Sequence, residues 1–347
     1  MKRRMSLLLA FLLCLSLLFT ACGNGSSENE PAPSEPNETT EPAAEAWVPK
    51  GNVRYIVGSS AGGGHDIAAR ALASCIEKKY NFTVGVENIS EGGGVIARTE
   101  NAFGEPDGYM VGQVDQSSIA DHYTNSDVTY SREDFRYVGI LNLETPTWLV
   151  SSKGKFAGMS AEEIFAYAKD HPGEVSWCTS GNWNAYVFSR FFLEQASGIK
   201  FNHVSIKGGA NCLLALVGGD VDIACVYPSE SKGYTDSGDA EVIVTTGQER
   251  SAAYPDAPTM KELGYDYYVQ GFKALVLPKA TPDDIYDGWC QIFRTVMEDP
   301  ATKTALEATN TTYAMLMGDE MNAFLDNVEA QIQDVVESDE YKATVSQ

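Results

Sequence analysis

The sequence predicts an α/β fold in which two doubly wound lobes enclose a central cleft. Short β-branched runs alternate with stretches of helical periodicity from about residue 53 onward, as in proteins built on a parallel sheet. This alternation restarts near residue 150, which indicates a second lobe. Several predicted strands also lead through glycines into the next helix, so we expect loops at the carboxyl ends of the strands to face the cleft.

The N-terminus has the features of an export signal. Basic residues at 2–4 precede an apolar run over 5–19, and a small residue, Ala21, stands directly before Cys22. This pattern is typical of a secretory signal, and the run is too short for a membrane-spanning helix. The position of the cysteine resembles a bacterial lipoprotein signal. We therefore expect a signal over 1–22 that ends at a lipidated Cys22; an ordinary secretory signal with a chance cysteine is the alternative.

Residues 23–46 have the composition of a flexible tether. They are rich in Ser, Pro, Glu, Asn and Thr and contain no basic or aromatic residue. Such a segment cannot bury enough apolar surface to fold, so we expect a disordered acidic tether. The formal net charge of the whole chain is −23, which argues against a nucleic-acid partner. A small anionic ligand is compatible with this charge, because backbone dipoles can hold an anion locally.

The first lobe begins with a strand that passes through glycines into a helix. Residues 54–57 predict the strand, residues 58–64 read GSSAGGG, and the apolar residues from Ile67 to Ile76 fall on one helical face. A helix N-terminus leaves backbone N–H groups unpaired, and glycines let a ligand approach them. This junction therefore predicts an anion site. A tight turn without a ligand is the alternative.

The remaining elements complete two lobes. Further predicted strands lie at 83–88, 109–114, 135–141, 147–150, 175–179, 203–206, 221–226, 242–246 and 275–278, with helices at 95–103, 160–169, 185–196 and 210–217. Capping boxes at 160–163 and 281–284 predict two helix starts, and a last helix carries apolar residues from 321 to 335. We expect one lobe to contain residues 47–149 and 271–347, and the other residues 150–270.

Cysteine and histidine usage gives no sign of a metal or a cofactor. Five cysteines follow Cys22, an odd number at wide spacing, which does not suggest a disulfide framework. We expect most of them to be buried as small apolar side chains. No pair has CxxC spacing and the four histidines are scattered. We therefore expect neither a metal nor a cofactor.

One ordered set of motifs resembles a known family. The motifs are IVGSSAGGGHD at 56–66, VEN at 86–88 with three glycines at 92–94, PDGY at 106–109, VSIKGG at 204–209, GGDVD at 218–222, and Arg250 with YPDAP at 254–258. In this order they resemble the extracytoplasmic solute receptors of tripartite tricarboxylate transporters, the TctC or Bug type, over about 53–315. The resemblance implies a type II periplasmic-binding-protein fold that closes on a small carboxylate. It also implies a non-catalytic, membrane-anchored monomer whose partner is a permease of that transporter type.

The resemblance further implies two carboxylate-holding loops, at 59–66 and 179–184. The expected ligand-binding residues are Ser59, Ser60, Gly62, Gly63, Gly64, His65, Asp66 and Asn88 in the first lobe, and Thr179, Ser180, Gly181, Asn182, Trp183, Asn184, Gly208 and Gly209 in the second. We expect uncharged donors, mainly backbone N–H groups of both loops, to hold the carboxylate. The chain departs from the family where Ser59, Ser60 and Ala61 replace an aromatic and two prolines, and it carries His65 in place of Thr.

Individual side chains have alternative interpretations. We expect Asp66 to accept backbone N–H bonds and fix its loop, because a carboxylate at the cleft floor would repel an anionic ligand. His65 is either an exposed turn residue or part of the cleft wall. Trp183 is either a wall over the ligand or a core residue, and Asn182 and Asn184 either bind the ligand or cap a helix.

The main alternative function is a secreted serine hydrolase. Residues 58–62 satisfy G-x-S-x-G between a strand and a helix, the context of a nucleophile elbow with Ser60 as nucleophile. However, this motif lies on the first strand of the folded part, whereas the hydrolase fold needs several strands upstream. The three successive glycines also delay the helix.

Overall fold

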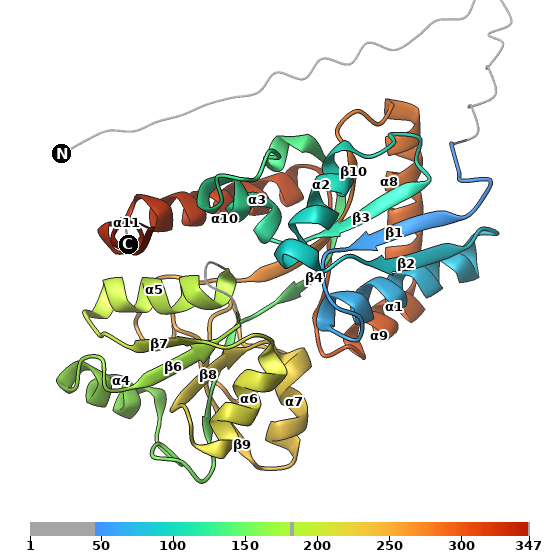
Figure 1. Cartoon of the computed structure of the whole chain (residues 1–347). Helices are drawn as coiled ribbons and strands as arrows, with labels where there is room; N and C mark the ends of the chain where they lie inside the picture. The colour runs from blue at the N-terminus through green and yellow to red at the C-terminus, as the bar shows by residue number, and fades with distance from the viewer. Residues whose placement is uncertain (1–45, 181–183, 346–347) are drawn as a thin grey trace, which may run out of the picture. The chain divides into compact units, whose positions relative to one another are not determined.

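The computed structural model describes residues 46–180 and 184–345. All of them belong to one compact unit over Glu45–Gln347 (Figure 1). The predicted lipidation site Cys22, nearly all of the predicted tether, and Gly181, Asn182 and Trp183 lie outside the described residues. Among the described helices, none is long and apolar enough to cross a membrane.

The first sheet has six strands in the order β11-β4-β10-β3-β1-β2 (Figure 1). They are β1 (Val53–Val57), β2 (Val84–Asn88), β3 (Met110–Val114), β4 (Phe135–Glu144), β10 (Gly271–Pro278) and β11 (Thr312–Leu316). β1 pairs in parallel with β2 and β3, whereas β10 is antiparallel to β3 and β4. The carboxyl ends of β1, β2 and β3 therefore meet at one edge of the sheet, where the glycine-rich loops lie.

The second sheet has five strands in the order β7-β6-β8-β5-β9. They are β5 (Thr147–Ser151), β6 (Ser176–Thr179), β7 (Asn202–Ser205), β8 (Ile223–Val226) and β9 (Ala240–Thr245). β6 is parallel to β7 and β8, and β5 is antiparallel to β8 and β9. Because β5 pairs only within this sheet, the sheet begins at Thr147, three residues before the lobe boundary expected at 149/150.

The helices follow the predicted alternation, with additions. They are α1 (Gly64–Lys79), α2 (Val95–Phe103), α3 (Ser117–Thr124), α4 (Ala161–Asp170), α5 (Ala185–Ser197), α6 (Gly209–Gly218), α7 (Pro228–Asp236), α8 (Asp283–Met297), α9 (Pro300–Glu307), α10 (Gly318–Glu337) and α11 (Asp339–Val345), with short 3₁₀ turns η1 (Glu91–Gly94) and η2 (Arg132–Asp134). The sequence patterns did not predict α3, α7, α9, α11 or β11.

The two predicted capping boxes have different outcomes. The first is confirmed, because Ser160 Oγ accepts from the N–H of Glu163 at 3.3 Å and Glu163 Oε2 accepts from the N–H of Ser160 at 2.8 Å. The second is wrong. The box at 281–284 would make Pro282 the first helical residue, but Pro282 has φ −56° and ψ 151°, outside the helical region, and no side chain caps the helix. Helix α8 therefore begins at Asp283.

The late helices pack on the first sheet. Trp289 of α8 is fully buried with Val53 and Val57 of β1 in one apolar cluster, and its indole N–H donates to Gly108 O at 3.0 Å. A second cluster joins α10 to Phe188 and Phe191 of α5, so this helix of the second sheet also contacts α10. The prediction of buried cysteines is confirmed for Cys75, Cys178, Cys212 and Cys225, while Cys290 is half-buried.

Candidate functional site

The loop between β1 and α1 is fixed by Asp66. The N–H of Gly62 donates to Asp66 Oδ2 at 2.8 Å, and Arg70 Nε lies 2.9 Å from Asp66 Oδ1. Burial alone would raise the pKa of Asp66, but the hydrogen bonds from Arg70 and Gly62 outweigh it and hold the pKa below its ordinary value. Gly62 has φ +79°, which favours glycine. The predicted role of Asp66 in fixing the loop is confirmed.

Two neighbours of this loop have different roles. Asn88, at the end of β2, donates to Ser59 O at 3.0 Å and accepts from Arg70 at 3.2 Å, so its amide supports the loop. Ser59 Oγ is buried and has no hydrogen-bond partner among the described residues. Ser59 lines a cavity of about 110 Å³ whose walls also contain Gly58, His65, Gly93, Arg98, Gln113, Val114, Asp115 and Ser117. We call this space the first-lobe cavity.

His65 belongs to the wall of the first-lobe cavity. Its Nε2 lies 3.4 Å from Asp115 Oδ2, and Gln113 Nε2 lies 3.3 Å from its Nδ1 and donates to its carbonyl at 2.9 Å. Burial lowers the pKa of His65, although the Asp115 carboxylate opposes the shift, so the imidazole is neutral at pH 7. Both ring nitrogens face residues other than Ser60, which is exposed. The arrangement lacks the serine–histidine contact that a hydrolase requires.

The glycines of η1 close the first-lobe cavity. A Cβ on Gly94 would lie 2.4 Å from Gly58 O, and Gly94 has φ +85°, so only glycine fits there. Arg98 of α2 is buried, donates to Gly93 O at 3.0 Å and pairs with Asp121 at 2.7 Å. The sequence patterns did not predict Gln113, Asp115 or Arg98, because these residues lie on β3, in the loop after it and on α2, outside any local motif.

The second predicted loop is largely engaged with itself. Thr179 is fully buried and donates to Cys225 O at 3.1 Å, so its hydroxyl is not available to a ligand, contrary to expectation. Asn184 is the N-cap of α5, with Oδ1 accepting from the N–H of Tyr186 at 3.2 Å. Ser180 Oγ accepts from the N–H of Gly208 at 3.0 Å and so ties this loop to the start of α6. Gly181, Asn182 and Trp183 lie outside the described residues.

The N-terminus of α6 is covered by a carboxylate of the chain itself. A Cβ on Gly209, the first residue of α6, would lie 2.2 Å from Glu230 Oε1. Glu230 Oε2 accepts from the Tyr186 hydroxyl and from the N–H of Tyr227, each at 3.2 Å. Burial raises the pKa of Glu230, while the Tyr227 hydrogen bond opposes the shift and the nearby Glu144 carboxylate adds to it. The sequence patterns did not predict this residue.

The two sheets meet at a group of residues that we call the cleft floor: Gly64, Glu144, Tyr227, Ser229 and Lys273. Glu144 ends β4 and Lys273 lies on β10; their side chains are buried, with 2.6 Å between Oε2 and Nζ. Ser229 Oγ donates to Glu144 Oε1 at 3.4 Å. A Cβ on Gly64 would lie 3.5 Å from Ser229 Oγ and 3.9 Å from Glu144 Oε1. The starts of α1 and α7, one from each sheet, therefore face each other here.

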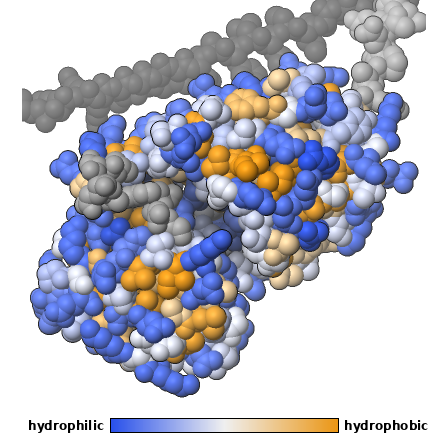
Figure 2. Space-filling view, in the orientation of Figure 1, coloured by the Kyte–Doolittle hydropathy of each residue, from blue (hydrophilic) through white to orange (hydrophobic). Residues whose placement is uncertain are grey.

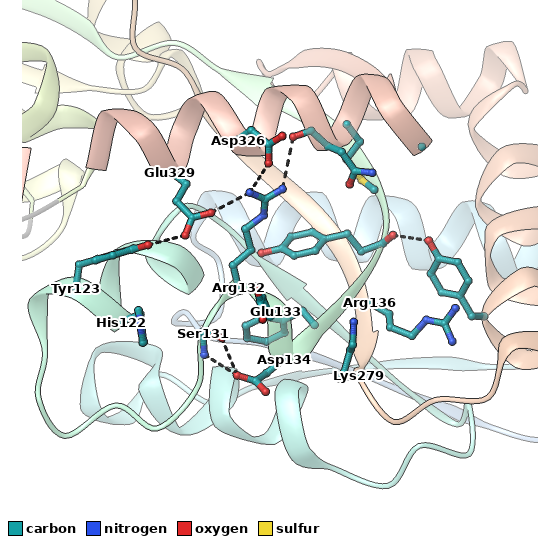
Figure 3. A pocket seen from close by; sticks show the side chains of 16 residues that line it. His122, Tyr123, Ser131, Arg132, Glu133, Asp134, Arg136, Lys279, Asp326 and Glu329 are labelled. Carbon is teal, nitrogen blue, oxygen red and sulfur yellow. Dashed lines mark hydrogen bonds and ion pairs between the residues drawn. The ribbon is translucent and has the colours of Figure 1, made fainter. Parts of the chain in front are cut away.

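A larger groove than the first-lobe cavity lies elsewhere, beside α3, η2 and α10 (Figure 3). Its volume is about 1050 Å³. Arg132 points from its wall to Asp326 at 2.7 Å and Glu329 at 2.9 Å, and Glu329 also accepts from Tyr123 at 2.6 Å. Arg132 is therefore paired with two carboxylates, and Arg136, also in this wall, pairs with Asp283 at 2.8 Å. Figure 2 shows a mixed polar surface with apolar patches. Among the residues that the structure describes, the exposed large apolar side chains are Ile67, Ile96, Phe103 and Leu214.

Among the described residues, no group of three or more His, Cys, Asp or Glu side chains could hold a metal ion. The two converging helix starts, the buried hydroxyl of Ser59 and the ion pair beneath them form a site for a small polar molecule.

Comparison with known proteins gives one consistent result. Residues 68–339 match the model of the "Tripartite tricarboxylate transporter family receptor" family, TctC. The chain is 30% identical over 258 residues to the "UPF0065 protein in gbd 5'region" of Cupriavidus necator, covering 74% of this chain and 78% of that protein.

Solved structures agree. A TctC solute binding protein from Polaromonas, determined with no ligand, superposes with a TM-score of 0.70 at 25% identity, covering 83% of this chain and 98% of that one. MatC from Rhodopseudomonas palustris, with bound malate, superposes with a TM-score of 0.72 at 22% identity, covering 84% and 100%. The expected two-lobed periplasmic-binding-protein fold is thus confirmed.

Proposed function

The chain belongs to the family of tripartite tricarboxylate transporter receptors, and from this membership we propose that it captures a small carboxylate between its lobes and delivers it to a membrane permease of that transporter type. It is an extracytoplasmic solute-binding receptor, and the family consists of receptors instead of enzymes. We assign residues 47–146 and 271–347 to one lobe and 147–270 to the other, with the hinge near the two connecting segments, because β5 begins at Thr147 and not at the expected boundary of 149/150. We further propose a monomer that is anchored through a lipid on Cys22.

The observation that supports this function most directly is Ser59. A buried hydroxyl without a partner costs free energy, so a ligand oxygen at that place would satisfy it. Of the predicted backbone donors, Gly62 donates to Asp66 and Gly63 donates to Ser60 O at 3.2 Å. The carboxylate is therefore held by Ser59 and by N–H groups at the start of α1 near Gly64, where the positive end of the helix dipole favours an anion.

Isothermal titration of the purified protein with malate and a series of mono-, di- and tricarboxylates tests the proposal. We expect at least one dissociation constant in the micromolar range. Ser59→Ala should weaken that binding by about tenfold, since a hydrogen bond to a charged group contributes about 1.5–3 kcal/mol. The control is Ser152→Ala in the turn after β5, where the hydrogen bond comes from the backbone N–H. Absence of binding across the series would reject the proposal.

A further inference from the structure

We propose that this receptor selects a carboxylate that also carries a positively charged nitrogen, an amino acid, and that Glu230 is the residue that recognises the nitrogen. The inference rests on the proposed function, because it names the ligand class of the same cleft. It follows from how the charges at the second-lobe side of the cleft are distributed.

Glu230 has polar neighbours but no cation. Both of its hydrogen bonds, from the Tyr186 hydroxyl and the Tyr227 N–H, go to Oε2, which leaves Oε1 against Gly209. In the part of the chain that the structure describes, Arg70 and Lys273 form ion pairs with Asp66 and Glu144, the imidazole of His65 lies against Asp115, and no basic side chain lies against Glu230. Glu230 is half-buried. A half-buried carboxylate without a cation is an acceptor for an ammonium group brought by a ligand.

The neighbouring groups do not neutralise Glu230. The charge of Lys273 is taken up by Glu144 at 2.6 Å. His65, which faces Asp115, is neutral because burial lowers its pKa. Arg98, which lines the first-lobe cavity, is paired with Asp121 at 2.7 Å. These groups therefore hold more negative than positive charge, and a ligand with carboxylates alone would add charge of the same sign. An amino acid adds one negative charge fewer than the matching acid without nitrogen, and it places its ammonium where the excess negative charge lies.

Glu230 also has a structural role, which a neutral side chain could fill. It is the third residue of the capping box of α7, where it accepts from the N–H of Tyr227. Glutamine serves this position as well as glutamate, and a glutamine carbonyl could accept from the Tyr186 hydroxyl too. The cap therefore explains the length of the side chain but not its charge. The start of α6, where Gly209 lies against Oε1, favours that charge without neutralising it.

The opposite side of the cleft suits a carboxylate. Ser59 Oγ is buried without a partner and lines the first-lobe cavity, and the start of α1 follows directly. The α6 start in the second lobe, by contrast, already carries the carboxylate of Glu230. A ligand with its carboxylate toward Ser59 and its ammonium toward Glu230 satisfies both sides. Ser59 thus accounts for the carboxylate that all candidate ligands share, and Glu230 alone distinguishes the amino acids among them.

The test uses pairs of ligands that differ only in the ammonium group. These are aspartate with succinate, glutamate with glutarate, alanine with propionate, and leucine with 4-methylpentanoate, titrated into the wild-type protein, Glu230→Gln and the control Glu162→Gln. Glu162 is an exposed acid on α4 of the second lobe, so the control makes the same change of charge outside the cleft. In the pair that binds, we expect the wild type to prefer the amino acid by about tenfold or more, since charged hydrogen bonds have that strength.

In Glu230→Gln the preference for the amino acid over its matching acid should fall to about twofold or less. The variant should bind the amino acid more weakly and the matching acid without nitrogen more tightly than the wild type does. Glu162→Gln should keep the wild-type ratio. If Glu230→Gln does not fold, Glu230→Asp should retain the preference and Glu230→Asn should lose it. A wild type that prefers the acids without nitrogen overturns this inference and leaves the proposed function standing. An unchanged ratio in Glu230→Gln overturns the role of Glu230, and absence of binding by any carboxylate rejects the proposed function itself.

Discussion

Glu144 and Lys273 form a buried ion pair on β4 and β10, the strand that leads out of the first sheet and the one that returns to it. Their charged atoms are 2.6 Å apart, and the Lys273 side chain is 0% exposed. Ser229, near the start of α7, donates to Glu144 at 3.4 Å, so a residue that follows β8 of the second sheet contacts the pair.

Removing one partner of this pair should destabilise the protein more than removing both. Lys273→Met leaves a buried carboxylate without a cation, which typically costs about 3–5 kcal/mol. The double variant Lys273→Met with Glu144→Gln should recover most of that loss. The measurement is the free energy of unfolding from urea denaturation.

The control for this prediction is an exposed ion pair on α9. Lys303 and Glu307 are 3.8 Å apart on the helix surface, so Lys303→Met should change the free energy of unfolding by less than about 0.5 kcal/mol. If the double variant is as unstable as Lys273→Met alone, the unpaired carboxylate is not the cause of the loss.

Asp66 should make the free energy of unfolding depend on pH in the acidic range. Its pKa is lowered in the folded protein, so its contribution is fully present above about pH 4, the value in an unfolded chain, and is lost as the pH falls through the lower folded value. The difference in unfolding free energy between wild type and Asp66→Asn should therefore shrink between pH 5 and pH 2, as followed by urea titrations. Asp127→Asn supplies the control, because it makes the same substitution at an exposed position. A constant difference for Asp66→Asn would contradict the ion-pair explanation.

The lipid anchor on Cys22 is testable separately from ligand binding. Cys22→Ser should move the protein from the membrane fraction to the soluble extracytoplasmic fraction and abolish incorporation of a labelled fatty acid. Cys14→Ser is the matched control, because Cys14 lies within the predicted signal and would be removed with it. Equal membrane retention of wild type and Cys22→Ser would favour the ordinary secretory signal.

The local features of the site were predictable from the sequence, and the long-range ones were not. The turn from β1 into α1 and the role of Asp66 follow from glycine placement and helix-start chemistry within eleven consecutive residues, 56–66. The meeting of Glu230 with Gly209 depends instead on the order β7-β6-β8, which brings the starts of α6 and α7 together. No periodicity along the chain carries that information.

Two errors have simple physical causes. Helix α7 escaped prediction because its sequence, PSESKGYTD, has almost no apolar residue from which a helical face could be recognised. Thr179 was expected to bind the ligand because it lies beside a polar turn, but it ends β6 and its side chain points into the interior, toward β8. Alternation along a strand decides the direction of a side chain, and the motif alone does not.

The start of α1 offers the sharpest test of where the ligand's carboxylate lies. A Cβ at Gly64 would make ordinary contacts of 3.5 Å to Ser229 Oγ and 3.9 Å to Glu144 Oε1, so the backbone there tolerates a side chain, and the further methyl groups of valine would extend into the cleft floor. Gly63 is less suitable, because its Cβ would lie 3.2 Å from Ser60 O and would disturb the loop itself.

We expect Gly64→Val to weaken binding of the best carboxylate at least a hundredfold, because it removes several hydrogen bonds to a charged group at once. The melting temperature without ligand should change by only a few degrees. Gly233→Val on α7 is the matched control, because a Cβ there meets nothing within 4 Å. If Gly64→Val binds like the wild type while Lys273→Met abolishes binding of the same ligand, the carboxylate is held by charge pairing at Lys273 and not by the start of α1.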